Sequence, residues 1–260
     1  MTDPFAGQRL DGKVVIVTGS TQGLGAAIAR RCAELGAAVM VTGRDAARGQ
    51  AVAEEVGGVF VAADLADPRA GEIVVGACDG RLDGLVNAAG LSSRGTLDDT
   101  SVELWDRLFA VNVRAPFLLM QQAARVMRRA GRGGSIVNII TMASHGGEPV
   151  LTGYSASKGA LAVLTRNAAY QLQPDRIRVN GLNIGWTATE GEHGVQTHTG
   201  QPDGWLAEAD ASRPFGRLLR PADIAPMVTF LLSDAAEMIT GSVMDYDQTV
   251  HGPYGAQVAA

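Results

Sequence analysis

The chain has 260 residues, of which 46% are hydrophobic, so it can bury a sizeable core. Its formal net charge is −5, and its 22 basic residues form no run or stripe that could follow a phosphate backbone, which argues against nucleic acid as a partner. The first twelve residues lack the features of a signal peptide, and no apolar run reaches the ~20 residues that a bilayer span needs, which argues against a membrane protein.

The cysteine content indicates the compartment in which the protein works. Only Cys32 and Cys78 occur, and both lie within apolar patterns. Buried thiols in a reducing environment fit this pattern better than a disulfide. We therefore expect a cytoplasmic protein.

Short runs rich in β-branched residues alternate along the chain with longer helical patterns. The predicted strands are 13–19, 37–43, 58–64, 82–90, 134–141, 176–184 and 239–247. The predicted helices are 23–35, 45–56, 67–78, 101–130, 153–173 and 221–233. Several strands are apolar throughout, as in parallel strands covered on both faces. The alternation predicts one doubly wound, Rossmann-type α/β domain over residues 1–260, with a mostly parallel seven-stranded sheet and helices on both faces.

Two helix starts and one long connection stand out along this pattern. Thr100-Ser-Val-Glu103 has the spacing of a capping box, and Asp67-Pro68 puts a cap residue before a proline at the first helical position. The stretch 185–217 is irregular, with six glycines and two prolines. A loop this long inside a compact domain is typical of a lid or binding loop, so we predict a substrate lid at about 186–216.

The first predicted strand runs directly into Thr18-Gly-Ser-Thr-Gln-Gly-Leu-Gly25 and then into a helix. Glycines at these positions let the backbone turn sharply and approach a pyrophosphate, which then lies over the free N–H groups at the helix N-terminus. Three glycines alone would fit an ordinary turn equally well. The position between the first strand and the first helix favours a dinucleotide site.

A tyrosine and a lysine share one face of a later predicted helix. Tyr154 and Lys158 are four residues apart, so both can point at one cavity. A free phenol, with a pKa of about 10, is a poor base at neutral pH, but a nearby cation stabilises the phenolate and lowers that value. Such a tyrosine can give a proton to a carbonyl oxygen that receives hydride, or take one from an alcohol that loses hydride.

These motifs, taken in order, resemble the short-chain dehydrogenase/reductase superfamily, of the classical type, over nearly the whole chain. The resemblance is carried by T-G-x-x-x-G-x-G at 18–25, Asn87-Ala-Ala-Gly90, Asn112 and Tyr154-x-x-x-Lys158. It implies an NAD(P)-dependent oxidoreductase that interconverts a secondary alcohol and a ketone by hydride transfer, with Tyr154 as general acid/base. It also implies a homo-oligomer, a tetramer or a dimer, formed through the 101–130 and 153–173 helices.

The same resemblance implies the catalytic set Asn112, Thr141, Tyr154 and Lys158. Thr141 stands where relatives usually have a serine that orients the substrate oxygen, and Ser144 is the alternative hydroxyl. Asn112 is expected to perturb its helix and to hold a water that connects to Lys158, although a satisfied core amide has the same sequence signature.

The resemblance further implies a set of cofactor contacts. These are Gly19, Thr21, Gln22, Gly23, Leu24, Gly25, Arg44, Asp64, Leu65, Asn87, Ala88, Gly90, Tyr154, Lys158, Gly185 and Thr189. Gly43 stands where relatives that use NAD carry an acid, and Arg44 follows it, which favours NADP(H). NAD(H) stays an alternative, because Gln22 replaces a basic residue common in NADP-dependent relatives and Asp45 could reach the ribose.

Two departures from the family pattern lie near the end of the chain. Ile184 replaces a proline after the sixth strand, and Asp247-Gln-Thr249 replaces an Asp-Gly-Gly run. We expect the first to loosen a turn and the second to change the geometry of the tail.

Candidate substrate contacts come from the segment 141–151 and from the lid. They are Ser144, His145, Glu148, Trp186, His193 and Trp205. Polar groups and two tryptophans suit a small polyhydroxylated substrate, a sugar, sugar acid or polyol, because each substrate hydroxyl needs a partner once water is excluded. A steroid or acyl chain would call for a more apolar lid. No metal is expected, because His193 and His198 do not share a helical face and no further ligand is suitably spaced.

Two other functions are compatible with these motifs. One is a catalytically silent protein of the same fold that binds the cofactor as a redox sensor or assembly partner, but retention of both Tyr154 and Lys158 favours the enzyme. The other is epimerisation or dehydration through a transient ketone, against which the modest chain length argues.

Overall fold

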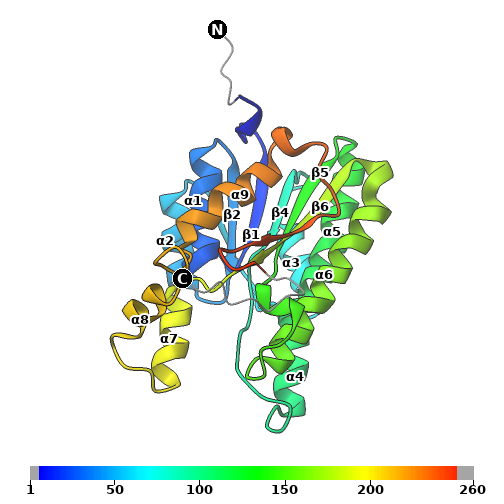
Figure 1. The fold of residues 1–260 in the computed structure, drawn as a ribbon. Coiled ribbons are helices and arrows are strands. Elements are labelled where there is room, and N and C mark those ends of the chain that lie inside the picture. Colours follow the sequence, from blue (N-terminus) through cyan, green and yellow to red (C-terminus); the bar gives the residue numbers. More distant parts are fainter. Residues whose placement is uncertain (1–5, 251–260) are drawn as a thin grey trace.

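Seven strands form one sheet in the order β3-β2-β1-β4-β5-β6-β7 (Figure 1). The computed structural model describes residues 6–250, and every strand pairing in that range is parallel. The strands are β1 (Val14–Thr18), β2 (Ala38–Gly43), β3 (Val59–Ala62), β4 (Gly84–Asn87), β5 (Gly134–Ile139), β6 (Ile177–Ile184) and β7 (Val243–Tyr246). All seven predicted strands are present, each shorter than or equal in length to its prediction.

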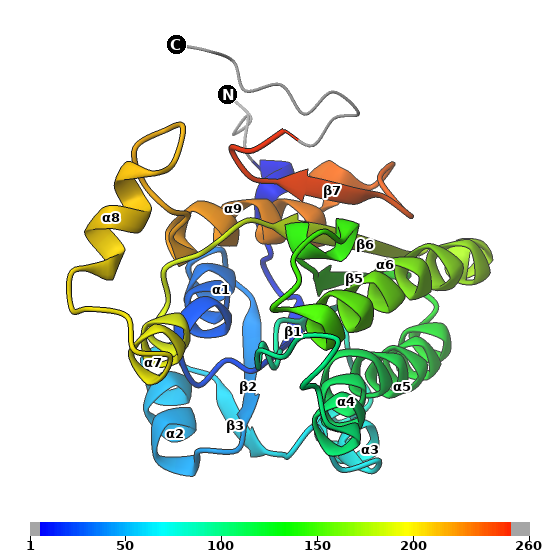
Figure 2. The ribbon, with the colours of Figure 1, turned by 60° about the horizontal axis from the view of Figure 1, so that its bottom comes forward.

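Helices cover both faces of the sheet, as Figure 2 shows. On one face lie α1 (Gly23–Glu34), α2 (Ala46–Glu55) and α9 (Pro221–Leu232). On the other lie α3 (Ala70–Gly76), α5 (Ala115–Ala130) and α6 (Thr152–Leu172). Successive residues of β1 point to opposite faces, so Val15 and Val17 enter the first core and Ile16 enters the second. The doubly wound α/β fold predicted from the sequence is confirmed.

The strand order places a crevice at the centre of the sheet. β1 pairs with β2 on one side and with β4 on the other, so the order reverses at β1. In open α/β sheets a ligand binds at such a switch point, outside the carboxyl ends of the strands.

Three helix boundaries differ from their predictions for local reasons. The Asp67 carboxylate accepts a hydrogen bond from Arg69 N at 2.8 Å, which makes a turn, and α3 begins only at Ala70. The cap of α4 (Val102–Phe109) is Ser101, whose hydroxyl accepts from Leu104 N, whereas the sequence pointed to Thr100. The single helix predicted over 101–130 is interrupted by a π-helical turn at 110–114, between α4 and α5.

The stretch 185–217, which we expected to be irregular, contains two helices, α7 (Glu190–His198) and α8 (Trp205–Ala211). They form a separate lobe beside the sheet (Figure 2). Trp205 is buried against Ala209 and Leu218, and Arg220 Nη2 lies 2.7 Å from the Asp210 carboxylate. The lobe therefore has a small core of its own and an ion pair to the segment before α9.

Both cysteines are buried free thiols, as predicted. No helix within residues 6–250 is long and apolar enough to cross a bilayer. The predictions of an N-terminus without a signal peptide and of a domain reaching from 1 to 260 extend over residues 1–5 and 251–260, which lie outside the described residues.

Candidate active site

A cavity of about 890 Å³ lies at the carboxyl ends of the strands, at the reversal of the strand order. Its walls come from the segments that follow β1 to β6 and from the lobe 186–216. This volume is in the range of pockets that enclose a small ligand, which is about 300–1,000 Å³.

The glycine loop after β1 forms one end of the cavity. Gly19 has φ +65°, and a Cβ there would lie 2.7 Å from Ala89 Cα; a Cβ on Gly25 would overlap the Gly19 carbonyl. Side chains at these positions would close the floor of the loop. Gln22 is the N-cap of α1 but its side chain makes no capping bond, so the first N–H groups of α1 face the cavity without a side-chain partner. This is a fitting cradle for a pyrophosphate.

The end of β2 lies beside this loop. A Cβ on Gly43 would lie 2.6 Å from Thr21 Cγ2, and Arg44 lines the cavity. The Asp45 carboxylate accepts a hydrogen bond from Arg48 N and caps α2, so it serves the helix instead of facing the cavity. Asp45 is therefore engaged as the cap of α2, and Arg44 is the basic residue that lines this end of the cavity.

The segments after β3 and β4 form the next part of the wall. Asp64, Leu65, Ala88 and Gly90 line the cavity as the sequence indicated. Asn87 does not: it is 1% exposed, and its Nδ2 donates to Asn138 Oδ1 at 2.8 Å, which ties β4 to β5.

Thr18 fixes the backbone that follows β4. Its Oγ1 accepts hydrogen bonds from Ala88 N and Ala89 N, both at 3.1 Å. The glycine loop and the Asn87–Gly90 segment are thereby held against each other.

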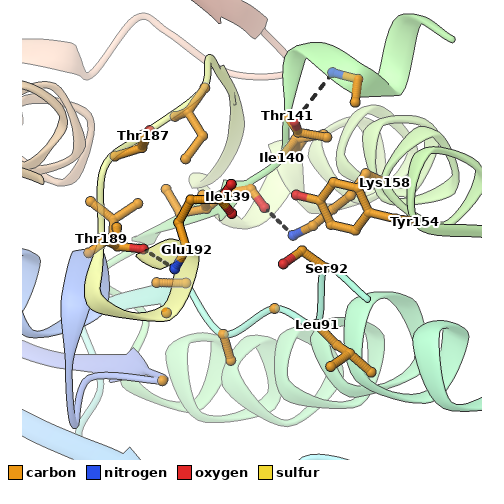
Figure 3. A pocket seen from close by; sticks show the side chains of 18 of the residues that line it. Leu91, Ser92, Ile139, Ile140, Thr141, Tyr154, Lys158, Thr187, Thr189 and Glu192 are labelled. Carbon is orange, nitrogen blue, oxygen red and sulfur yellow. Dashed lines mark hydrogen bonds between the residues drawn. The ribbon is translucent and has the colours of Figure 1, made fainter. Parts of the chain in front are cut away.

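Tyr154, at the first turn of α6, meets Thr141 across the cavity wall (Figure 3). Burial raises the pKa of the Tyr154 phenol to about 12, against a lowering by the hydrogen bond with Thr141 and a further rise from the charge of Glu192. Thr141 Oγ1 also accepts from Ala143 N at 3.2 Å, which fixes the hydroxyl at the end of β5.

Lys158 is 3% exposed, and its Nζ donates to the Ile139 carbonyl at 2.7 Å. Burial lowers the pKa of this ammonium to about 8. We expected Lys158 to lower the pKa of Tyr154; the pKa of the phenol is instead raised, with burial as the largest cause, and Lys158 is not among the groups that shift it. Tyr154 therefore carries its proton at neutral pH.

Asn112 lies in the π-helical turn and is fully buried. Its Oδ1 accepts from Leu91 N and its Nδ2 donates to Leu91 O, both at 2.9 Å, while Nδ2 also donates to Ser157 Oγ at 3.0 Å. A Cβ on Gly90 would lie 3.5 Å from Lys158 Nζ and 3.7 Å from Asn112 Oδ1, so the amide and the ammonium face the same small space. The expected local perturbation of the helix is present.

Comparison with known proteins places this arrangement in a family. The sequence model of a family described as Enoyl-(Acyl carrier protein) reductase matches residues 19–251. An NADP-dependent (R)-specific alcohol dehydrogenase of Lentilactobacillus kefiri is 33% identical over 96% of this chain and 99% of that protein. The chain belongs to the short-chain dehydrogenase/reductase superfamily.

Further members of the superfamily support the same conclusion. A sorbitol dehydrogenase of Cereibacter sphaeroides is 34% identical over 92% of this chain and 97% of its own length. A crystal structure of a gluconate 5-dehydrogenase from Burkholderia cenocepacia, in complex with NADP and tartrate, superposes with a TM-score of 0.85 at 27% identity, covering 95% of this chain and 98% of that one. The predicted enzyme class, a short-chain alcohol dehydrogenase or ketoreductase using a nicotinamide dinucleotide, is confirmed.

The residues expected to contact substrate lie in different places. Glu148 and Trp186 line the main cavity of this short-chain dehydrogenase/reductase, and Glu148 also borders a second depression. Ser144 and His145 line this second, open depression of about 440 Å³, where His145 Nε2 lies 2.9 Å from Asp245 Oδ1. Thr141, and not Ser144, is thus the hydroxyl beside Tyr154.

The other two lid residues serve the interior of the lobe. His193 Nδ1 accepts from Trp205 Nε1 at 3.0 Å, and Trp205 stacks on Trp186 with ring centroids 5.9 Å apart. Neither His193 nor Trp205 is among the residues that line the main cavity. They hold α7 and α8 together behind Trp186.

Sequence reasoning missed several charged residues of the substrate end. Glu192, Arg107 and Arg213 line the cavity, and Arg213 lies 5.4 Å from the centroid of the Trp186 ring. The spacing Thr189-x-x-Glu192 is that of a capping box and could have signalled α7. Thr189 and Gly185 line the cavity as expected, with Thr189 Oγ1 capping α7 by accepting from Glu192 N. Within residues 6–250 no three His, Cys, Asp or Glu side chains come together as a metal site.

Proposed function

We propose that this enzyme interconverts a secondary alcohol and a ketone of a small polyhydroxylated molecule, with NADP(H) as its preferred cofactor and Tyr154 as general acid/base. The observation that carries the proposal is that Tyr154, Thr141 and Lys158 meet on one wall of a cavity whose other end is the glycine loop. A nicotinamide cofactor supplies or accepts the hydride when it is bound.

The protein's own residues handle the proton and the oxygen. In ketone reduction, the carbonyl carbon gains a hydride and its oxygen gains the Tyr154 proton, which together give the alcohol. The Thr141 hydroxyl hydrogen-bonds the same oxygen and stabilises its developing charge. Lys158, close to the space that Asn112 and Gly90 border, stabilises the phenolate that remains and reprotonates it through that space. Alcohol oxidation runs through these steps in reverse.

Three features support NADP(H) over NAD(H). Gly43 leaves no carboxylate at the end of β2 to bind a ribose 2′-OH, Arg44 lines the cavity there, and Asp45 is engaged in capping α2. Arginine suits a phosphate because its planar fork of donors matches phosphate oxygens. The proposed cofactor contacts remain those that line the cavity, together with Asn87 as a support behind them.

The proposed assembly is a homo-oligomer formed through α4 to α6. Trp105, Phe117 and Val163 lie on these elements with large exposed apolar surfaces, of 39%, 45% and 58%. Burial of these side chains against a second copy of the chain would remove apolar surface from water, which supports this assembly. We keep the cytoplasm as the proposed location.

Turnover of a polyol panel tests the proposal. Absorbance at 340 nm is followed with sorbitol, galactitol and threitol for the wild type, for Tyr154→Phe and for Tyr170→Phe, an exposed tyrosine on the same helix. We expect Tyr154→Phe to lose about 100-fold to 10,000-fold in kcat while NADPH binding persists, and Tyr170→Phe to match the wild type. If Tyr154→Phe turns over at the wild-type rate, the proposed role of Tyr154 is wrong.

A further inference from the structure

Glu192 is a lid carboxylate that turns away from the helix it begins. It is the third residue of α7, and Thr189 caps its N–H at 3.1 Å. In a capping box the Glu side chain would return to the N-cap backbone. Here Oε1 instead accepts from Trp186 Nε1 at 2.8 Å and from Gln196 Nε2 at 2.6 Å. The carboxylate therefore does not close a capping box, and Trp186 and Gln196 hold it in place instead.

The second oxygen of this carboxylate, Oε2, has no hydrogen bond within residues 6–250. Glu192 lines the cavity with 17% of its side chain exposed, and Figure 3 shows it projecting from the lid toward the space in front of Tyr154. Arg94 Nη2 also approaches Oε1, at 3.8 Å. The polar contacts of the Glu192 carboxylate within residues 6–250 therefore all involve Oε1. A carboxylate accepts about four hydrogen bonds. Oε2 therefore keeps acceptor capacity on the substrate side.

In the part of the chain that the structure describes, the charged groups around Glu192 leave its negative charge without a cation bonded to Oε2. The negative charge of Glu192 contributes to the raised pKa of Tyr154, so the two side chains interact electrostatically. Lys158, a buried cation that lines the same cavity, directs its Nζ to Ile139 O. Three arginines line the cavity at this end: Arg94 approaches the oxygen that is already bonded, Arg213 stacks on Trp186, and Arg107 makes no hydrogen bond or ion pair with Glu192 within residues 6–250.

We propose that Glu192 Oε2 accepts a hydrogen bond from the substrate hydroxyl next to the reacting carbinol, and so selects neutral polyols over sugar acids. This inference rests on the proposed function, because it needs the substrate carbinol at Tyr154. A hydroxyl donates to the carboxylate, whereas a substrate carboxylate in that place would bring two negative charges together. A hydrogen bond to a charged group is worth about 1.5–3 kcal/mol, which corresponds to roughly 10-fold to 100-fold in kcat/KM.

The test compares Glu192→Gln with Glu190→Gln, which removes the same charge from an exposed position in the same helix turn. Glutamine keeps an oxygen for Trp186 and Gln196, so the lid contacts are retained. The probes are sorbitol, galactitol and threitol, each beside its aldonate, and 2,3-butanediol beside 2-butanol. NADPH affinity is measured by fluorescence titration in every variant.

We expect the wild type to prefer each polyol over its aldonate by about tenfold or more. Glu192→Gln should raise KM for the polyols and the diol, lower their kcat/KM about tenfold, leave 2-butanol within about twofold, and narrow the gap between polyol and aldonate. In polyol oxidation the rate rises with pH as Tyr154 deprotonates, and this rising limb should move to lower pH in Glu192→Gln, because the pKa of Tyr154 falls when the negative charge is removed. Glu190→Gln and all NADPH affinities should stay unchanged.

The inference is overturned if the wild type prefers aldonates, or if Glu192→Gln weakens 2-butanol as much as the diol. The second result would show a general role in the lid. A wild type that binds NADPH and oxidises no alcohol of either set overturns the proposed function and the role of Glu192 together. A wild type that oxidises them with equal efficiency overturns only the role of Glu192.

Discussion

The glycine loop and the lid form opposite ends of one cavity, and they are built in different ways. The loop depends on backbone: Gly19 and Gly25 have no room for a Cβ, and the first N–H groups of α1 lie free of side-chain caps. The lid depends on side chains that meet across long distances, with Trp205 as its core and the Asp210–Arg220 ion pair as its fastening. The loop end of the cavity is thus shaped by a short local motif, whereas the lid end is shaped by tertiary contacts.

The largest difference between the two regions is expected when one glycine in each is replaced by alanine. A Cβ in Gly25→Ala would overlap the Gly19 carbonyl, so we expect NADPH affinity to fall more than about 100-fold and Tm to drop. Gly194 in α7 has nothing within 4 Å of its Cβ position, and alanine there should gain about 0.5–1 kcal/mol of stability. Fluorescence titration and thermal unfolding check both. Equal loss of NADPH binding in the two variants would contradict the account.

Lys158 joins the two ends, and its burial links function to stability. Lys158→Met should lose activity by about 100-fold or more. The folded pKa of about 8 lies below the ordinary 10.5, so the folded state disfavours the ammonium; the penalty, about 3 kcal/mol at most, is complete below pH 8 and vanishes by about pH 10.5. Wild-type stability should therefore rise, relative to Lys158→Met, as pH increases over that window.

Chemical unfolding at pH 7 and pH 10 measures this difference. Lys13→Met serves as the control, because Lys13 is an outlying residue paired with Asp234 at 2.7 Å and should change stability by less than about 1 kcal/mol. A constant difference between wild type and Lys158→Met over the two pH values would show that the ammonium is not destabilised by burial.

Removing the charge of Arg44 should separate the affinities for the two nucleotides. Arg44→Ala should weaken NADPH about tenfold or more, since a charge-assisted bond to the 2′-phosphate is lost, and leave NADH within about twofold. Competitive titration with the two nucleotides measures the ratio. An equal effect on both nucleotides would assign Arg44 to the solvated surface and return NAD(H) as the alternative.

The smallest effect is expected at the base of the lid. Gln248, part of the run that departs from the family pattern, accepts from Phe215 N and donates to Arg217 O, both at 2.7 Å. Gln248→Ala should loosen the lid and raise the substrate KM about two- to fivefold with unchanged NADPH affinity. Gln201→Ala, at an exposed lid glutamine, is the control. A change in NADPH affinity in Gln248→Ala would place its role at the other end of the cavity.

The sequence allowed the fold and the loop end to be predicted because their determinants are local. Apolar runs with turn signals predicted all seven strands, and the glycine spacing predicted the sharp turn between β1 and α1 that lines one end of the cavity. Tyr154 and Lys158 could be paired because residues four positions apart on a helix lie on the same face.

The rest depended on contacts that no local pattern contains. Gly191 and Gly194 obscured α7, which Thr189 and the buried Trp205 cluster stabilise. His193 and Trp205 looked like substrate contacts, yet they bond to each other within the lobe. The pKa of Tyr154 could not be judged either, because burial of the phenol, its hydrogen bond with Thr141 and the charge of Glu192 all depend on tertiary positions.

Transfer of deuterium tests the central claim most directly. The wild type and Tyr154→Phe are incubated with NADP⁺ and a polyol deuterated at its secondary carbinol carbons. The deuterium content of the reduced nucleotide is then measured by mass spectrometry. The account predicts one deuterium per NADPH from the wild type and at least 100-fold slower transfer in Tyr154→Phe. Ketone formation without deuterium in the nucleotide, or transfer by Tyr154→Phe at the wild-type rate, would contradict it.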